Sequence, residues 1–84
     1  MEQYVILARS VTYAQRMQKL LGQAGIRCEI SRAPRDLTDL GCAYVLRLDS
    51  RDAVQALMIL RRGDLDPLRV FFCHNGSCRE VVSV

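Results

Sequence analysis

The order of two periodicities along the chain constrains its fold more than any other feature of the sequence. Strand patterns, either unbroken or alternating in apolar residues, cover 4–8, 26–31, 43–48 and 68–73. Apolar residues at the helical spacings of three and four cover 13–24 and 53–60. The resulting order of strand, helix, strand, strand, helix, strand predicts an α+β fold, the ferredoxin-like βαββαβ sandwich, in which two helices cover one face of a four-stranded antiparallel sheet.

The pattern within each strand predicts its place in that sheet. The unbroken apolar run over 4–8 is typical of a strand that is covered on both sides, and right-handed crossovers place the first and third strands in the middle. The segment 26–31 alternates apolar with polar residues, which fits an edge strand. The alternation in the last strand predicts three inward-pointing residues, Leu68, Val70 and Phe72.

The expected helices begin and end at residues suited to those positions. Ser10 or Thr12 is expected to cap the first helix, and Gly25 is expected to end it. Asp49 or Ser50 is expected to cap the second helix. The expected core stripe of the second helix consists of Ala53, Ala56, Leu57 and Leu60. Its further apolar residues, Val54, Met58 and Ile59, indicate either deeper burial in the same core or a homodimer contact.

The length and composition indicate one small domain and argue against several functions. We expect a domain over 1–73 and a C-terminal tail over 74–84, which the turn-forming pair Asn75-Gly76 could return as an added strand. The apolar runs are far shorter than the roughly 20 residues that span a bilayer, and the N-terminus lacks signal-peptide features, so we expect a cytoplasmic protein that does not bind membranes. A scattered net charge of +3, without an aromatic-bearing strand of the RNA-recognition-motif type, argues against nucleic-acid binding.

Cys42 is the first candidate for chemistry, because it stands where a loop rich in Pro, Asp and Gly meets an apolar strand. In the predicted topology the third strand begins beside the end of the first, so we expect Cys42 near Arg9, Ser10 and the N-terminus of the first helix. The positive end of the helix dipole, together with Arg9, Arg32 and Arg35, would stabilise a thiolate there. The alternative is a small, half-buried residue that opens a strand and has no chemistry.

The other three cysteines are expected to be reduced in a cytoplasmic protein. Cys28 lies between two isoleucines of an alternating pattern and is expected to pack in the core. The tail motif Cys73-His-Asn-Gly-Ser-Cys78 admits a hairpin turn, a disulfide across that turn, or a metal site in which Cys73, His74 and Cys78 are the weak candidate ligands. No Ser-His-Asp set and no Gly-rich phosphate loop is apparent, so we expect neither an ordinary enzyme nor a cofactor.

Four features in order resemble a known family. They are Tyr4-Val-Ile-Leu-Ala-Arg-Ser10, the helix end Lys19-Leu-Leu-Gly-Gln-Ala-Gly-Ile26, the segment Ala33-Pro-Arg35, and a Cys at the start of the next strand. This set is similar to the small selenium/sulfur carrier-like proteins, described as a domain of unknown function. The resemblance covers roughly residues 3 to 72 and leaves the tail out.

The resemblance implies that the protein carries sulfur or selenium as a cysteine persulfide or perselenide. It places Pro34, Arg35 and Cys42 at the family's motif positions, and it implies a donor protein and an acceptor protein as partners. The chain departs from the family at Ala43, where the motif has a Gly that would let a partner approach the backbone closely. The alternative function is a non-catalytic interaction or small-ligand-binding domain, in which Cys42 has no chemical role.

Overall fold

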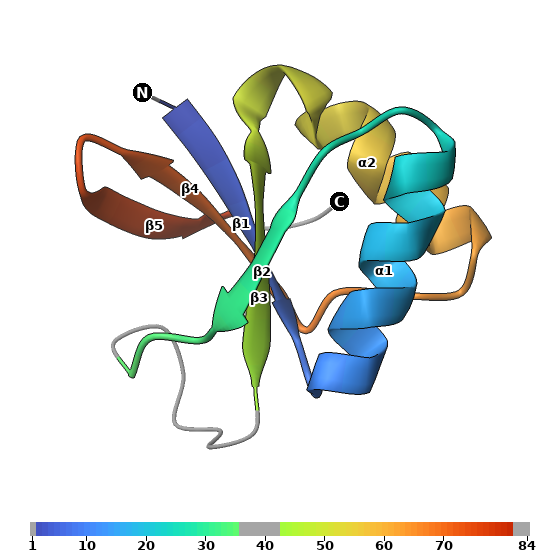
Figure 1. Ribbon diagram of the computed structural model, residues 1–84. Coiled ribbons are helices and arrows are strands. Elements are labelled where there is room, and N and C mark those ends of the chain that lie inside the picture. The colour runs from blue at the N-terminus through green and yellow to red at the C-terminus, as the bar shows by residue number, and fades with distance from the viewer. Residues whose placement is uncertain (1, 36–42, 82–84) are drawn as a thin grey trace.

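The described part of the chain is an α+β domain with one five-stranded antiparallel sheet, two α-helices and a short 3-10 helix (Figure 1). The computed structural model describes residues 2–35 and 43–81. The strands are β1 (Glu2–Ala8), β2 (Glu29–Arg32), β3 (Tyr44–Asp49), β4 (Arg69–His74) and β5 (Ser77–Val81). The helices are α1 (Val11–Gln23), the short 3-10 helix η1 (Ser50–Asp52) and α2 (Ala53–Arg62).

The strand order is β2-β3-β1-β4-β5, and all four pairings are antiparallel. The first and third strands therefore lie side by side inside the sheet, and the second strand forms an edge, as the sequence predicts. The expected number of four strands is wrong, because β5 from the tail pairs with β4 and extends the sheet. The tail thus adds an edge strand to the sheet that the rest of the chain forms.

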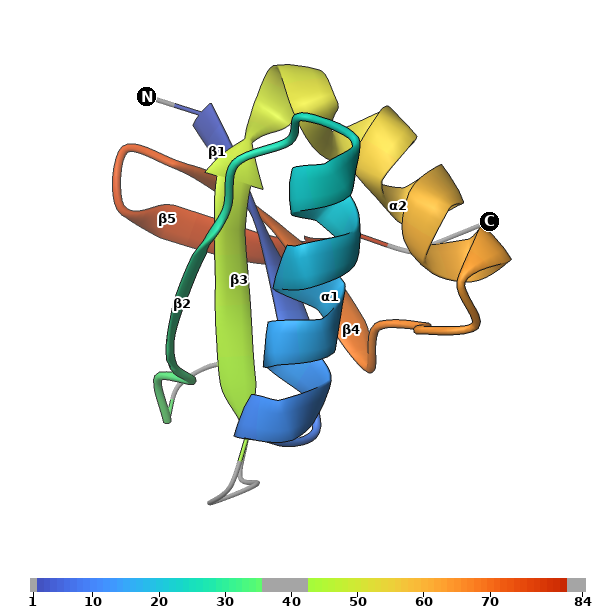
Figure 2. The same ribbon diagram turned by 45° about the vertical axis from the view of Figure 1, so that its right-hand side comes forward.

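Helices α1 and α2 both lie on one face of the sheet (Figures 1 and 2). Their apolar stripes meet the side chains of alternate strand residues in the main hydrophobic cluster. The buried members of this cluster are Ile6, Ala8, Ala14, Met17, Leu21, Ile26, Leu46, Leu48, Ala56 and Leu60. The core stripe predicted for the second helix is therefore confirmed, because Ala53, Ala56 and Leu60 are buried. Val54 and Met58, by contrast, are exposed on the outer side of α2.

The opposite face of the sheet carries a second buried cluster. It consists of Val5, Leu7, Ala43, Val45, Phe71 and Cys73. This cluster confirms that the first strand is covered on both sides, but it corrects the prediction for the last strand. Val70 is buried as expected, whereas Leu68 is 40% exposed and Phe72 is half-buried. Phe71 is buried instead, because it pairs with Val5 on the face away from the helices.

The boundary between α1 and β2 depends on local hydrogen bonds that shorten the predicted strand. The Ile26 amide donates to the Leu21 carbonyl at 3.0 Å, so Ile26 still belongs to the helix end. Gly25 has a φ of 81°, the left-handed conformation expected where this helix ends. The Gln18 side chain donates to the Cys28 carbonyl at 2.9 Å, and ladder pairing begins at Glu29, which lies opposite Arg47.

Candidate functional site

Three elements meet at the carboxyl end of β1, where the sequence places the candidate site. Ala8, the last residue of β1, pairs with Tyr44, the first residue of β3. The Ala33 amide, just after β2, donates to the Ala43 carbonyl at 3.1 Å. The end of β1, the end of β2 and the start of β3 therefore lie together, and α1 begins at the same end of the sheet (Figure 1).

Ser10 caps α1 at this end of the sheet. Its backbone is extended, with φ −156° and ψ 166°, and its hydroxyl accepts a hydrogen bond from the Tyr13 amide at 3.2 Å. Its carbonyl accepts the Ala14 amide at 3.0 Å, which is the first bond of the helical ladder. The choice that the sequence leaves between Ser10 and Thr12 is therefore decided for Ser10. The positive end of the α1 dipole points out of this end of the sheet.

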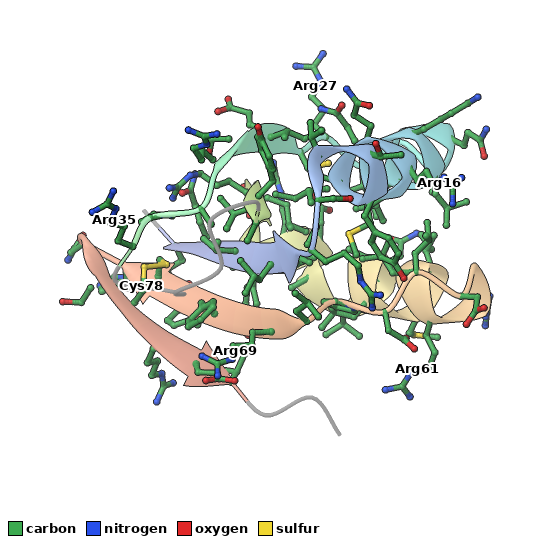
Figure 3. The ribbon with its side chains drawn as sticks, turned by 90° about the horizontal axis from the view of Figure 1, so that it is seen from below. Arg16, Arg27, Arg35, Arg61, Arg69 and Cys78 are labelled. Carbon is green, nitrogen blue, oxygen red and sulfur yellow. A yellow bond between two sulfur atoms is a disulfide. The ribbon has the colours of Figure 1, made fainter. Side chains whose placement is uncertain are left out.

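All three predicted arginines lie at this end and are exposed to solvent, and Arg32, the last residue of β2, pairs with Tyr44. The Arg9 guanidinium lies 4.9 Å from the centroid of the Tyr13 ring, in a cation–π contact that the sequence analysis did not anticipate. Arg9 and Tyr13 are four residues apart in the sequence, and this spacing across the helix start could have indicated the contact. Arg35 is exposed and follows β2, as Figure 3 shows. Neither Arg9 nor Arg35 forms an ion pair with a carboxylate in the described part of the chain.

Cys42 itself lies outside the described residues, so its predicted position stays a prediction. Its chain neighbour Ala43 is 1% exposed and begins the chain's path into β3. Of the predicted site residues, the structure brings Arg9 and Ser10 to the end of the sheet where Ala43 lies. Arg35 lies two residues beyond Ala33, which is hydrogen-bonded to Ala43.

The two tail cysteines are joined as a disulfide, which corrects the expectation that they are reduced. Cys73 on β4 and Cys78 on β5 lie directly opposite each other, with 4.0 Å between their Cα atoms. Cys73 also pairs with Gln3, near the amino end of β1, so the disulfide lies at the opposite end of the sheet from Ala43. Sequence reasoning left this disulfide as one of three possibilities for the motif.

The tail offers little to a metal ion in this state. A disulfide has no thiolate to donate, and the remaining candidate, His74, has its Nδ1 atom 3.7 Å from the Glu2 carboxylate. Within the described ranges, no three His, Cys, Asp or Glu side chains are grouped so that they could hold a metal ion.

Cys28 lies in a less reactive environment than an exposed thiol. It is half-buried against the main hydrophobic cluster, and burial raises the pKa of its thiol above the usual value. It helps to line an open cavity of about 830 Å³, together with Gln18 and Arg47. Because Glu2 and Gln3 also line it, this cavity lies at the amino end of β1 and away from Ala43.

The chain belongs to the family described as "Putative Se/S carrier protein-like", whose profile matches residues 3–71. The resemblance inferred from the residues is therefore confirmed. No curated protein and no solved structure matches the chain. No helix in the described part of the chain is long and apolar enough to cross a membrane.

Proposed function

We propose that the protein carries sulfur or selenium as a persulfide or perselenide on Cys42. The observation that carries this proposal is the family match over residues 3–71, which includes two cysteines, Cys28 and Cys42. Cys28 is a poor nucleophile, because it is half-buried and its pKa is raised by burial. Cys73 and Cys78 lie outside the matched range. Cys42 is therefore the thiol that best suits the family's role.

Loading is a transfer between thiols and needs no external oxidant. The Cys42 thiolate attacks the outer sulfur of a persulfide on the donor protein, forming a new S–S bond at Cys42. The S–S bond of the donor breaks, and its electron pair leaves with the donor cysteine as a thiolate. An acceptor thiolate removes the outer sulfur from Cys42 in the same way. Cys42 is regenerated, so the protein acts as a carrier between two partner proteins.

The surroundings of Ala43 support this chemistry, because they favour a negative charge. The N-terminus of α1 and the exposed cations of Arg9 and Arg35 lie at this end of the sheet. In the proposed site they stabilise the thiolate before loading and the terminal sulfur anion after it. Ser10 acts by capping α1, which holds the helix end in place.

The proposal is tested by incubating the protein with a persulfide donor and measuring its intact mass. We expect the wild-type protein to gain about 32 Da per sulfur, or about 80 Da when the donor supplies selenium. Cys42→Ser is expected to abolish this gain. Cys28→Ser is the matched control, because it removes another thiol of the matched range, and it is expected to load like the wild type. Equal loading of Cys42→Ser and wild type would contradict the proposal.

A second candidate function, an interaction domain, is favoured by an apolar surface on α2. Val54 is 73% exposed and Met58 is 50% exposed, and they lie one turn apart on the helix. This pair matches the homodimer contact considered from the sequence. Sedimentation at increasing concentration tests it: a dimer that Met58→Lys converts to a monomer supports the contact. A wild-type protein that stays monomeric contradicts it.

A further inference from the structure

We propose that Cys73 and Cys78 form a reversible dithiol–disulfide site that exchanges electrons with an external dithiol. The pair lies on the β4–β5 hairpin, beyond the range that the family profile matches. Its chemistry is therefore an addition to the proposed carrier function and does not depend on it. Figure 3 shows the sulfur–sulfur bond at Cys78 on the hairpin.

Strand pairing keeps the two sulfur atoms within bonding reach in both redox states. Cys73 and Cys78 are directly opposite in the β4–β5 ladder, and their side chains point to the same face of the sheet. Their Cα separation of 4.0 Å is close to the ~4.5 Å of a non-hydrogen-bonded antiparallel pair. Because the β4–β5 ladder pairs the two cysteines and their neighbours on both sides, the reduced thiols stay close enough for the disulfide to form again.

The hairpin has means of holding β5 other than the disulfide. Asn75 and Gly76 form its two-residue turn with φ values of 50° and 83°, the left-handed pair that a tight hairpin requires. Arg69 and Glu80 form an ion pair at 3.8 Å across the two strands. The disulfide closes a sequence separation of only 5 residues, so it removes less chain entropy than a bridge between distant segments would. Reduction is therefore compatible with an intact fold.

The two cysteines differ in exposure, and this difference sets the order of attack. Cys78 is exposed, whereas Cys73 is 8% exposed and packs in the second cluster beside Phe71. A thiolate of the external dithiol attacks the Cys78 sulfur, and the Cys73–Cys78 bond breaks with its electron pair on Cys73, which takes up a proton. The second thiol of the reductant then closes its own disulfide and releases Cys78. The protein gains two electrons and two protons, and the reductant loses them.

An external reductant supplies the two electrons, because Cys28, the free thiol in the described part of the chain, lies far from the disulfide. Cys73 pairs with Gln3, whereas Ala43, the neighbour of Cys42, precedes the pair Tyr44–Ala8. The distance along β1 from Gln3 to Ala8 is about 17 Å at the usual rise per strand residue. Cys28 precedes β2, at the opposite edge of the sheet from β5. Cys28 therefore does not reach the disulfide without a large rearrangement.

The experiment uses dithiothreitol as the external dithiol and follows each cysteine by mass. The folded protein is treated with oxidised dithiothreitol, then with reduced dithiothreitol, and then with oxidised dithiothreitol again. A sample taken after each treatment is labelled with a maleimide and cleaved with trypsin. Cleavage after arginine separates Cys28, Cys42 and the tail pair onto peptides 28–32, 36–47 and 70–79. We expect peptide 70–79 to take no label after oxidation, two labels after reduction, and none after reoxidation, with an unchanged far-ultraviolet circular dichroism spectrum.

Three results would overturn the proposal: two labels after the oxidising step, labels that appear only in denaturant, or loss of the native spectrum on reduction.

The order of attack is tested separately with the variants Cys73→Ser and Cys78→Ser and an aromatic disulfide reagent. Cys78 in the first variant is expected to react about tenfold or more faster than Cys73 in the second, because the nucleophile must reach solvent. Equal rates would refute the order of attack. Because every step is read on peptide 70–79, failure of carrier loading at Cys42 leaves the result unaffected.

Discussion

Replacing Ser10 with alanine tests its role as the N-terminal cap of α1. The substitution removes the hydroxyl that accepts the Tyr13 amide at 3.2 Å, but it keeps the carbonyl that accepts the Ala14 amide. One of the two bonds at the cap is therefore lost, and the expected cost is about 1 kcal/mol of unfolding free energy. In a domain of this size that corresponds to a fall of roughly 4–8 °C in the melting temperature.

Urea unfolding followed by far-ultraviolet circular dichroism measures this change. Ser10→Asn is the matched control, because the asparagine side chain also accepts the Tyr13 amide, and it is expected to stay within a few tenths of a kcal/mol of the wild type. The capping argument would be refuted by an alanine variant as stable as the wild type. It would also be refuted by equal losses in the alanine and asparagine variants.

Three further predictions follow from burial and backbone conformation. Leu60→Ala, at a fully buried position on α2, is expected to cost about 2–5 kcal/mol in urea unfolding, whereas the half-exposed Met58→Ala should cost far less; similar costs would contradict the assigned core. Gly76→Ala, at a φ of 83° with open space around the added methyl group, should cost about 1–2 kcal/mol through backbone strain alone, and no loss would argue against the left-handed turn. Burial raises the pKa of Cys28 in the folded state above that in the unfolded state. The neutral thiol therefore contributes its full stabilisation at a pH below the usual thiol pKa of about 8.5, and this stabilisation is lost as the pH rises above that value. At neutral pH peptide 28–32 should therefore be alkylated more slowly than free cysteine, and an equal rate would refute this.

The order of elements was predictable because it follows from local apolar patterns. The unbroken apolar run in β1 and the apolar stripes of the two helices are such patterns, and the burial of β1 and of the central stripe residues agrees with them. The start of β2 was not predictable from its alternation, because hydrogen bonds from Ile26 to the α1 end and from Gln18 to Cys28 delay the strand until Glu29. These hydrogen bonds involve residues of α1, so they cannot be inferred from the alternation within the strand segment itself.

Burial in β4 and the state of the tail cysteines depend on contacts between distant segments. Phe71 is buried because Val5 and the start of β3 form a second cluster on the helix-free face, whereas an alternating pattern assigns one inner face to a strand. The Asn75-Gly76 signal correctly indicated the hairpin, but the pattern of residues could not choose between free thiols, a disulfide and a metal site. At the candidate site, Arg9 and Ser10 were expected from topology, since the end of β1 and the start of β3 must meet in this strand order.

The most direct test of the carrier proposal is to locate the loaded sulfur on the chain and follow its release. After incubation with a persulfide donor and tryptic cleavage, peptide 36–47, which contains Cys42, should gain about 32 Da. Addition of an acceptor thiol before cleavage should return that peptide to its original mass. An added sulfur found on peptide 28–32 or 70–79, or none on any peptide, would contradict the assignment of the carrier thiol to Cys42.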